Sequence, residues 1–245
     1  MANASRIGAS VAADSTGVFV TFEGGEGAGK STQTALFAEA LRSAGREAVR
    51  LREPGGTAIG EQLRAVVLDP SNGEMAPMCE LFVYEAARAQ LVSEKIAPAL
   101  ARGAVVLCDR FCDSTVAYQA YGRGLDETAV LRANEAACQG VRPDMTIVLE
   151  APSAASGLCR AEAVAQPDRL EQAGEAFHER VNEAFRVIAA REPDRVRVVA
   201  PCDSIEEAAR AVFAHLAPLL PELALDGVLD MAREADARRV AESRI

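Results

Sequence analysis

Long apolar segments and secretion signals are absent from this 245-residue sequence. No apolar run is long enough to cross a membrane. The Ala/Ser-rich start also lacks the hydrophobic stretch that marks a signal peptide. We therefore expect a cytoplasmic protein with no membrane partner, in which residues 1–16 form a disordered leader or tag.

Positive charge is also scarce, because 26 Lys and Arg residues stand against 36 Asp and Glu residues and the net charge is −10. This balance excludes a broad basic surface for nucleic acid, but it allows a local basic pocket for a small phosphate ester. The six cysteines include no CxxC pair, and no nearby histidine completes a metal set. We expect them to be reduced thiols that pack as small apolar residues.

Short apolar runs alternate with segments of helical periodicity along most of the chain. Continuous apolar runs are typical of strands buried on both faces, so the pattern predicts an α/β protein with a five-stranded parallel sheet between two layers of helices. We expect one domain at residues 17–220 and a charged helical tail at 221–245. The expected strands are 18–22, 48–51, 104–107, 145–149 and 196–199, and the expected helices are 31–43, 57–68, 77–101, 113–121, 126–138, one capped by Ser153, 174–191 and 204–215.

Residues 24–31 match the phosphate-binding pattern G-x-x-x-x-G-K-[ST] between an expected strand and an expected helix. Glycines let backbone N–H groups curl around phosphates, and the helix directs its positive N-terminus at the same anion. Lys30 supplies charge to the transferring phosphoryl group, and the Ser31 hydroxyl is a ligand for Mg²⁺. We predict ATP phosphate contacts from Gly24, Gly25, Gly27, Ala28, Gly29, Lys30, Ser31 and Thr32.

The phosphate-binding loop does not by itself define the reaction, because GTPases, motor ATPases and small-molecule kinases all use it. The guanine-binding motif NKxD is absent, which argues against a GTPase. A carboxylate that serves the metal should end another apolar strand, and Asp109 and Glu150 are both candidates. Arg110 follows Asp109 directly, and a cation at that position suits an enzyme that holds a second phosphate.

Further motifs resemble those of the bacterial thymidylate kinases, in the order of that family and over residues 18–219. The match implies a P-loop kinase fold with a short lid at about 160–170. The matching blocks are FEG through Gln33, REPGGT at 52–57, YEAARAQ at 84–90, DRF at 109–111 with Ser114-Thr115 and AYQ at 117–119, RPD at 142–144, and DRLE at 168–171.

The resemblance implies roles for residues on the acceptor side, which would bind dTMP. Glu26 would accept a hydrogen bond from the deoxyribose 3′-hydroxyl, Tyr84 would stack on thymine, and Tyr118 would exclude a ribose 2′-hydroxyl. Arg52 and Arg110 would clamp the acceptor phosphate through their planar guanidinium groups, and Asp109 would hold Mg²⁺ through water or orient the acceptor. The implied dTMP-binding residues are Glu26, Arg52, Pro54, Tyr84, Arg88, Arg110, Ser114, Thr115, Tyr118 and Gln119.

The lid is poor in arginine, and this is a departure from the family pattern. The phosphate-binding loop carries no arginine of its own, and only Arg160 and Arg169 are basic within the lid. Because an arginine in the transition state is worth about three or more orders of magnitude in rate, we predict that Arg160 or Arg169 acts catalytically with Lys30 and Arg110. The alternative role for either lid arginine is an ion pair with a helix carboxylate such as Glu171.

The resemblance implies that ATP phosphorylates dTMP with Mg²⁺, and that the protein is a homodimer. The helices at 77–101 and 113–121 are candidates for the dimer's apolar face. No catalytic histidine is needed, because the nucleophile is already a phosphate dianion. Two alternatives stay open: a P-loop kinase for another nucleoside or nucleotide, and a nucleotide-binding protein with weak turnover.

Overall fold

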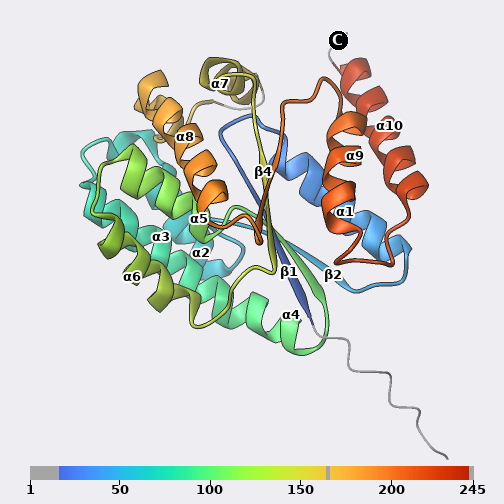
Figure 1. Cartoon of the computed structure of the whole chain (residues 1–245). Coiled ribbons are helices and arrows are strands. Elements are labelled where there is room, and N and C mark those ends of the chain that lie inside the picture. Colours follow the sequence, from blue (N-terminus) through green and yellow to red (C-terminus); the bar gives the residue numbers. More distant parts are fainter. Residues whose placement is uncertain (1–16, 164–165, 243–245) are drawn as a thin grey trace, which may run out of the picture.

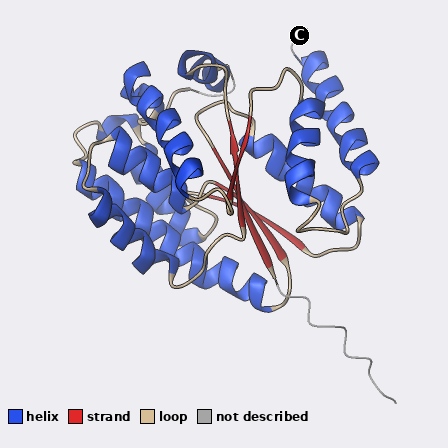
Figure 2. Cartoon of the chain, in the orientation of Figure 1, coloured by secondary structure: helices blue, strands red, loops and turns tan. Residues whose placement is uncertain are grey.

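A computed structural model describes residues 17–163 and 166–242 of the chain. The expected leader at 1–16, the centre of the lid and the last three residues of the expected tail therefore lie outside the described part. Five strands form one sheet in the order β2-β3-β1-β4-β5 (Figure 2). All neighbouring strands pair in parallel, as the sequence predicted. The strands are β1 (Val18–Glu23), β2 (Ala48–Arg52), β3 (Val105–Asp109), β4 (Met145–Leu149) and β5 (Val196–Val199).

Helices cover both faces of the sheet (Figure 1). Helices α1, α9 and α10 lie on one side, and α2 to α6 with α8 lie on the other. Thr57 and Ser204 accept hydrogen bonds from backbone N–H groups at the starts of α2 and α9, and such caps stabilise a helix start. The helices are α1 (Lys30–Ser43), α2 (Ala58–Leu68), α3 (Pro77–Leu91), α4 (Ala97–Ala101), α5 (Cys112–Thr115), α6 (Glu127–Cys138), α7 (Ala154–Glu162), α8 (Glu175–Arg191), α9 (Ile205–Leu216) and α10 (Leu225–Glu242).

Alternating side chains of each central strand fill the two layers of the core. In β1, Val20 and Phe22 pack with α1, α9 and α10, whereas Phe19 packs with the helices of the opposite face. All three side chains are fully buried. The continuous apolar runs therefore arise because both faces of the sheet exclude water.

The expected helix at 77–101 is divided into α3, a π-helical segment at Val92–Ile96, and α4. Pro98 explains the interruption, since it has no amide hydrogen and its ring would clash with the carbonyl of Glu94 in a straight α-helix. The expected helix at 113–121 is also altered, because α5 continues as a π-helical segment, Val116–Gly122. Residues 113–120 are buried within the chain, so this segment cannot supply the apolar dimer face that the sequence suggested.

The expected C-terminal tail is largely part of the folded core. Val228 and Ala232 of α10 are fully buried and pack in the same apolar cluster as α1 and α9. The charged sequence of α10 hid this, because its few apolar residues lie on one narrow face.

No described helix is both long and apolar enough to cross a membrane. All six cysteines are free thiols, although Cys79 and Cys159 are exposed rather than packed.

Candidate active site

The phosphate-binding loop joins the end of β1 to the start of α1, so its backbone lies at the carboxyl edge of the sheet. Gly24 has a φ of 126°, and a Cβ there would lie 2.1 Å from the carbonyl oxygen of Leu149. Gly27 has a φ of 59°, and a Cβ there would lie 2.2 Å from the carbonyl oxygen of Gly157. Only glycine fits at either position, and the loop is thereby held closely against β4 and α7.

Lys30 and Ser31 begin α1 and point into the loop region. The Lys30 ammonium donates to the carbonyl of Gly25 at 2.5 Å. Burial, together with the positive charge of Arg110, lowers the pKa of Lys30 to about 8, so a bound polyphosphate would stabilise its protonated form. The Ser31 hydroxyl donates to the carboxylate of Asp109, which places the two expected metal ligands side by side.

Arg110 links the phosphate-binding loop to the acceptor half of the site. Its guanidinium donates to Glu26 at 2.8 Å and to the carbonyl of Gly24 at 3.1 Å. It also lies 4.9 Å from the centre of the Tyr118 ring, within cation–π range. The backbone of Arg110 has a φ of 69°, which is uncommon for a residue with a side chain. These contacts place a permanently charged group between the phosphate-binding loop and Tyr118.

Glu26 is ionised because of the charges around it. Burial alone would raise the pKa of Glu26, but Arg110 and Lys30 outweigh burial and lower it to about 2. The Tyr118 hydroxyl donates to the same carboxylate oxygen at 2.7 Å. Glu26 therefore remains a hydrogen-bond acceptor at any physiological pH, as a contact to a sugar hydroxyl requires.

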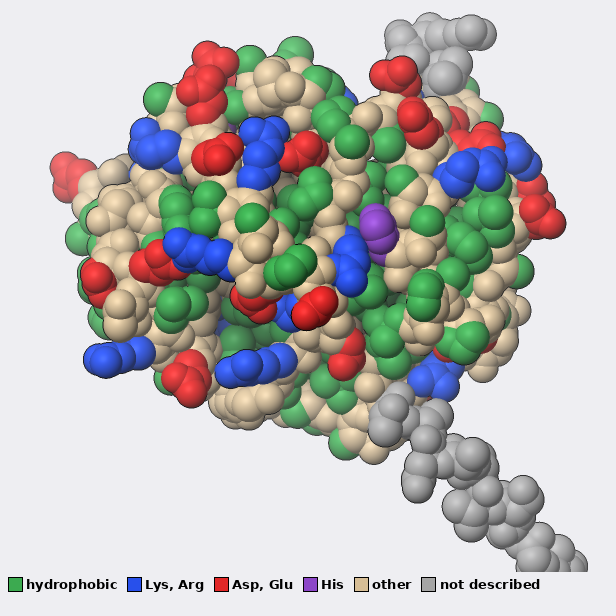
Figure 3. All heavy atoms as spheres, in the orientation of Figure 1, with side chains coloured by type: hydrophobic (Ala, Val, Ile, Leu, Met, Phe, Trp, Pro, Cys, Tyr) green, Lys and Arg blue, Asp and Glu red, His purple; other side chains and the backbone are tan. Residues whose placement is uncertain are grey.

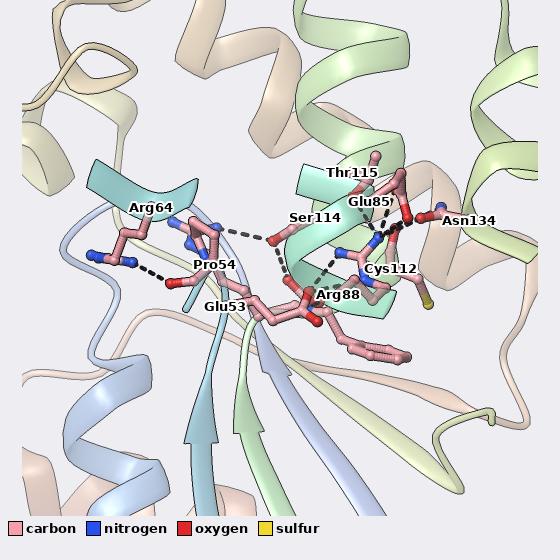
Figure 4. A network of polar contacts seen from close by, with 12 residues as sticks. Glu53, Pro54, Arg64, Glu85, Arg88, Cys112, Ser114, Thr115 and Asn134 are labelled. Atoms are coloured by element: carbon pink, nitrogen blue, oxygen red, sulfur yellow. Dashed lines mark hydrogen bonds and ion pairs between the residues drawn. The ribbon is translucent and has the colours of Figure 1, made fainter. Parts of the chain in front are cut away.

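Arg88 is the centre of a buried polar network at the far end of the site (Figure 4). It donates to Glu53 at 2.6 Å, to Glu85 at 2.8 Å, to Thr115 at 2.9 Å and to Asn134 at 2.6 Å. Its side chain is 2% exposed. Because a guanidinium has five N–H donors in a fixed plane, this network determines the orientation of Arg88 and of Thr115.

Arg52 lies at the end of β2 and meets the turn that follows it. Its guanidinium donates to the carbonyl of Pro54 and to Glu61, both at 2.9 Å. Arg64 donates to the same Pro54 carbonyl at 2.9 Å, and Figure 4 shows it reaching back from α2 to this turn. The peptide bond between Glu53 and Pro54 is cis. Two cations therefore converge on one backbone oxygen.

These elements surround one cavity of about 780 Å³. It runs from the acceptor residues, past the phosphate-binding loop, to the turn between β5 and α9. Gly24, Gly25 and Arg169 are the only predicted site residues that are not in its lining. The predicted residues in the lining are Glu26, Gly27, Ala28, Gly29, Lys30, Ser31, Thr32, Arg52, Pro54, Tyr84, Arg88, Asp109, Arg110, Ser114, Thr115, Tyr118, Gln119 and Arg160.

The two lid arginines have different environments. Arg160 is exposed at the end of α7, lines the cavity, and has no hydrogen-bond or ion-pair partner within residues 17–163 and 166–242. Arg169 is buried, pairs with Glu80 at 2.6 Å and donates to the carbonyl of Val67 at 2.8 Å. The ion pair considered for Arg169 thus exists, but with Glu80 of α3 rather than Glu171. The structure does not bring Arg169 to the cavity.

Glu150, the other candidate for a metal-side carboxylate, lies at the end of β4. It accepts a hydrogen bond from Arg186 of α8 at 2.7 Å. Asp109, in contrast, is bound by the Ser31 hydroxyl. This geometry favours Asp109 over Glu150 as the metal-side carboxylate.

Sequence analysis missed Arg64, Glu80 and the ion pair of Glu53 with Arg88. Arg64 lies three residues after Glu61 and four before Leu68, and this helical spacing places Arg64 and Leu68 on the cavity side of α2. Glu80 is fully buried, and it accepts from Gln119 and pairs with Arg123 as well as Arg169. A lone glutamate in a helix gives no sequence signal of such burial.

The parallel sheet, the phosphate-binding loop at the start of α1 and the convergent arginines define a P-loop phosphotransferase of the small-molecule kinase class. On the face seen in Figure 3, acidic and basic side chains are interspersed. This face therefore carries no broad area of one charge.

Comparison with known proteins assigns the family within this class. Residues 22–212 match the family model described as thymidylate kinase. A thymidylate kinase of Geobacter sulfurreducens is 50% identical over 211 residues, which cover 84% of this chain and 99% of that protein. One from Trichlorobacter lovleyi is 44% identical over 214 residues, covering 85% and 99%. The crystal structure of thymidylate kinase from Ehrlichia chaffeensis superposes with a TM-score of 0.63 at 32% identity, covering 75% of this chain and 93% of that one. The chain belongs to the thymidylate kinase family.

Proposed function

We propose that this enzyme transfers the γ-phosphoryl group of ATP to dTMP and so produces ADP and dTDP. The observation that carries the proposal is the contact of Arg110 with Glu26 and Gly24 of the phosphate-binding loop. It joins a donor-phosphate loop to a second basic site inside one cavity. An enzyme that only hydrolyses a nucleotide has no need for this second site.

Two arginines define where the acceptor phosphate would lie. Arg52 and Arg110 stand at the ends of adjacent strands, β2 and β3, and both line the cavity. Their planar guanidinium groups suit a phosphate, because each can bond two oxygens at once. A phosphate held there faces the terminal phosphate above Lys30, as in-line transfer requires. No general base is needed, because the attacking group is already an anion.

Thymine and deoxyribose would occupy the remainder of the acceptor arm. Tyr84 lines this arm and offers a flat ring for the base. Arg88 and Thr115, oriented by their mutual hydrogen bond, would meet the polar edge of the base. The ionised Glu26 would accept from the 3′-hydroxyl, while Tyr118, fixed by its bond to Glu26, would occupy the place of a 2′-hydroxyl.

The family's phosphate donor, ATP, is used with a metal, and Mg²⁺ fits the residues present here. Ser31 and Asp109 present adjacent hydroxyl and carboxylate oxygens, which are the hard ligands that Mg²⁺ prefers, and a carboxylate often acts through water. When bound, Mg²⁺ would neutralise charge on the transferring phosphoryl group. The chain's own contribution is to hold these oxygens next to Lys30.

An acceptor screen tests the proposed reaction. Release of ADP would be measured with ATP and Mg²⁺ against dTMP, dUMP, dCMP, dGMP and thymidine. We expect dTMP to give the highest kcat/KM, because Arg52 and Arg110 require a phosphate and Arg88 and Thr115 favour the thymine edge. Preference for another acceptor would instead support a different nucleotide kinase, and ATP binding without turnover would support a nucleotide-binding role.

We predict that Arg160, rather than Arg169, supplies lid charge to the transition state. Arg160→Ala should lower kcat by about three orders of magnitude with little change in thermal stability, because the exposed side chain has no partner to lose among the described residues. Arg169→Ala should mainly destabilise the fold, since the buried Glu80 carboxylate would lose one of its two arginine partners. Steady-state kinetics and thermal melts of both variants make the test. Near-normal turnover of Arg160→Ala would rule out this assignment.

We also propose a homodimer formed through α2, α3 and α6, which lie next to one another. These helices expose large apolar side chains at Ile59, Val66, Met78, Phe82 and Leu131, and Phe82 is 60% exposed. Several large apolar side chains exposed on neighbouring helices are typical of an interface. The free cysteines agree with a reducing compartment, which supports a cytoplasmic location.

Sedimentation velocity tests the interface. The wild-type chain should sediment at twice its 25.8 kDa mass. Phe82→Glu should shift it to the monomer, because a charge would be buried at the contact. Ala237→Glu, on the exposed face of α10, is the control and should remain dimeric. A monomeric wild-type protein would refute the proposal.

A further inference from the structure

Helix α10 lies beyond residues 22–212, the part of the chain that matches the family model. It nevertheless runs beside α9, and its C-terminal end lies at the same end of the molecule as α7 (Figure 1). Val228 and Ala232 anchor it in the core. An element outside the family match is thus a fixed part of the fold, next to the cavity.

Two charged residues of α10 fix it against the start of α9. The carboxylate of Asp236 accepts from the backbone N–H groups of Ile205 and Glu206, both at 3.2 Å. Arg233 donates two hydrogen bonds to the Glu206 carboxylate, at 3.1 and 2.9 Å. The carbonyl of Ile205 accepts from Gln33 of α1 at 3.2 Å. Helix α10 is therefore tied directly to the start of α9 and, through Ile205, to α1, the helix that follows the phosphate-binding loop.

Arg239 lies almost one helical turn beyond Asp236 and lines the cavity. Its side chain is 60% exposed, and its guanidinium forms a 3.4 Å ion pair with Asp236. No other partner exists for it within the described ranges, 17–163 and 166–242. An exposed ion pair at this distance contributes little to stability. The guanidinium of Arg239 is therefore available to a ligand.

The arm of the cavity beside Arg239, here called the donor arm, is the part in which the nucleoside of ATP would lie. The phosphate-binding loop lies between this arm and the acceptor arm. The aromatic side chains of the lining, Tyr84, Phe111 and Tyr118, all belong to the acceptor arm. The donor arm is lined instead by small or aliphatic groups such as Ala200, Ile205 and Ala208.

We propose that Arg239 packs its guanidinium plane against the adenine ring of bound ATP, so that α10 completes the donor site. The proposal rests on ATP being the phosphoryl donor. A guanidinium is planar and weakly hydrated, and it stacks on π systems in a way that an ammonium does not. Because the described residues of this arm include no aromatic side chain, Arg239 supplies the flat surface that a purine requires.

Kinetics of three variants test this role at saturating dTMP. Arg239→Ala should raise KM for ATP about three- to tenfold, as expected for loss of a cation–π contact, with kcat and KM for dTMP nearly unchanged. Arg238→Ala removes the neighbouring exposed arginine and should leave both KM values at the wild-type level. Arg239→Lys retains the charge but not the plane, and its KM for ATP should resemble that of Arg239→Ala.

An unchanged KM for ATP in Arg239→Ala would overturn the proposal, as would full recovery in Arg239→Lys, since charge alone would then suffice. Calorimetric titration of ATP without acceptor gives a second readout and should show the same three- to tenfold weakening. This readout does not depend on the acceptor. A failure of dTMP phosphorylation by the wild-type enzyme would contradict the proposed reaction, yet leave the ATP titration of Arg239→Ala interpretable.

Discussion

The contact of Arg110 with Glu26 and Tyr118 is the interaction on which the rest of the site depends. Arg110 is held in a left-handed backbone conformation at the end of β3. Its charge is balanced by a carboxylate that belongs to the phosphate-binding loop. In the proposed reaction, one residue of that loop pairs with the arginine proposed to bind the acceptor phosphate, so the donor and acceptor phosphates would not be positioned independently. The geometry therefore favours transfer between two phosphates over hydrolysis of one.

The parallel sheet makes this contact possible. β1 lies between β3 and β4, so the loop after β1 and the Asp109-Arg110 turn after β3 emerge side by side. Buried polar groups then hold the surrounding side chains in place. The network around Arg88 fixes the base end, and the ion pair between Glu80 and Arg169 ties one end of the lid to α3. Side chains that are already fixed by such buried contacts lose few conformations when substrate binds.

Sequence analysis predicted the parts of the molecule that follow local rules. The strands are continuous apolar runs, and the phosphate-binding loop follows from its spacing of glycines and lysine. The buried Glu80 and the packing of α10 were missed, because each depends on contacts between residues far apart in the chain. The π-helical segment Val92–Ile96 has a local cause in Pro98, but helical periodicity alone does not distinguish it from an α-helix. The roles proposed for the acceptor residues rest on family resemblance, since a lone tyrosine or arginine has no local signature of its role.

The central claim is that Arg110 binds the acceptor phosphate. The most direct measurement compares the calorimetric affinities of dTMP and thymidine for the wild-type enzyme and for Arg110→Ala, with Arg102→Ala as an exposed control. The account predicts that Arg110→Ala weakens dTMP binding about 10- to 100-fold, the usual effect of losing hydrogen bonds to a charged group. Thymidine, which has no phosphate, should lose much less affinity than dTMP, because only the indirect effect of Arg110 on Glu26 and Tyr118 is lost. Equal losses for both ligands, or no loss for dTMP, would contradict the account.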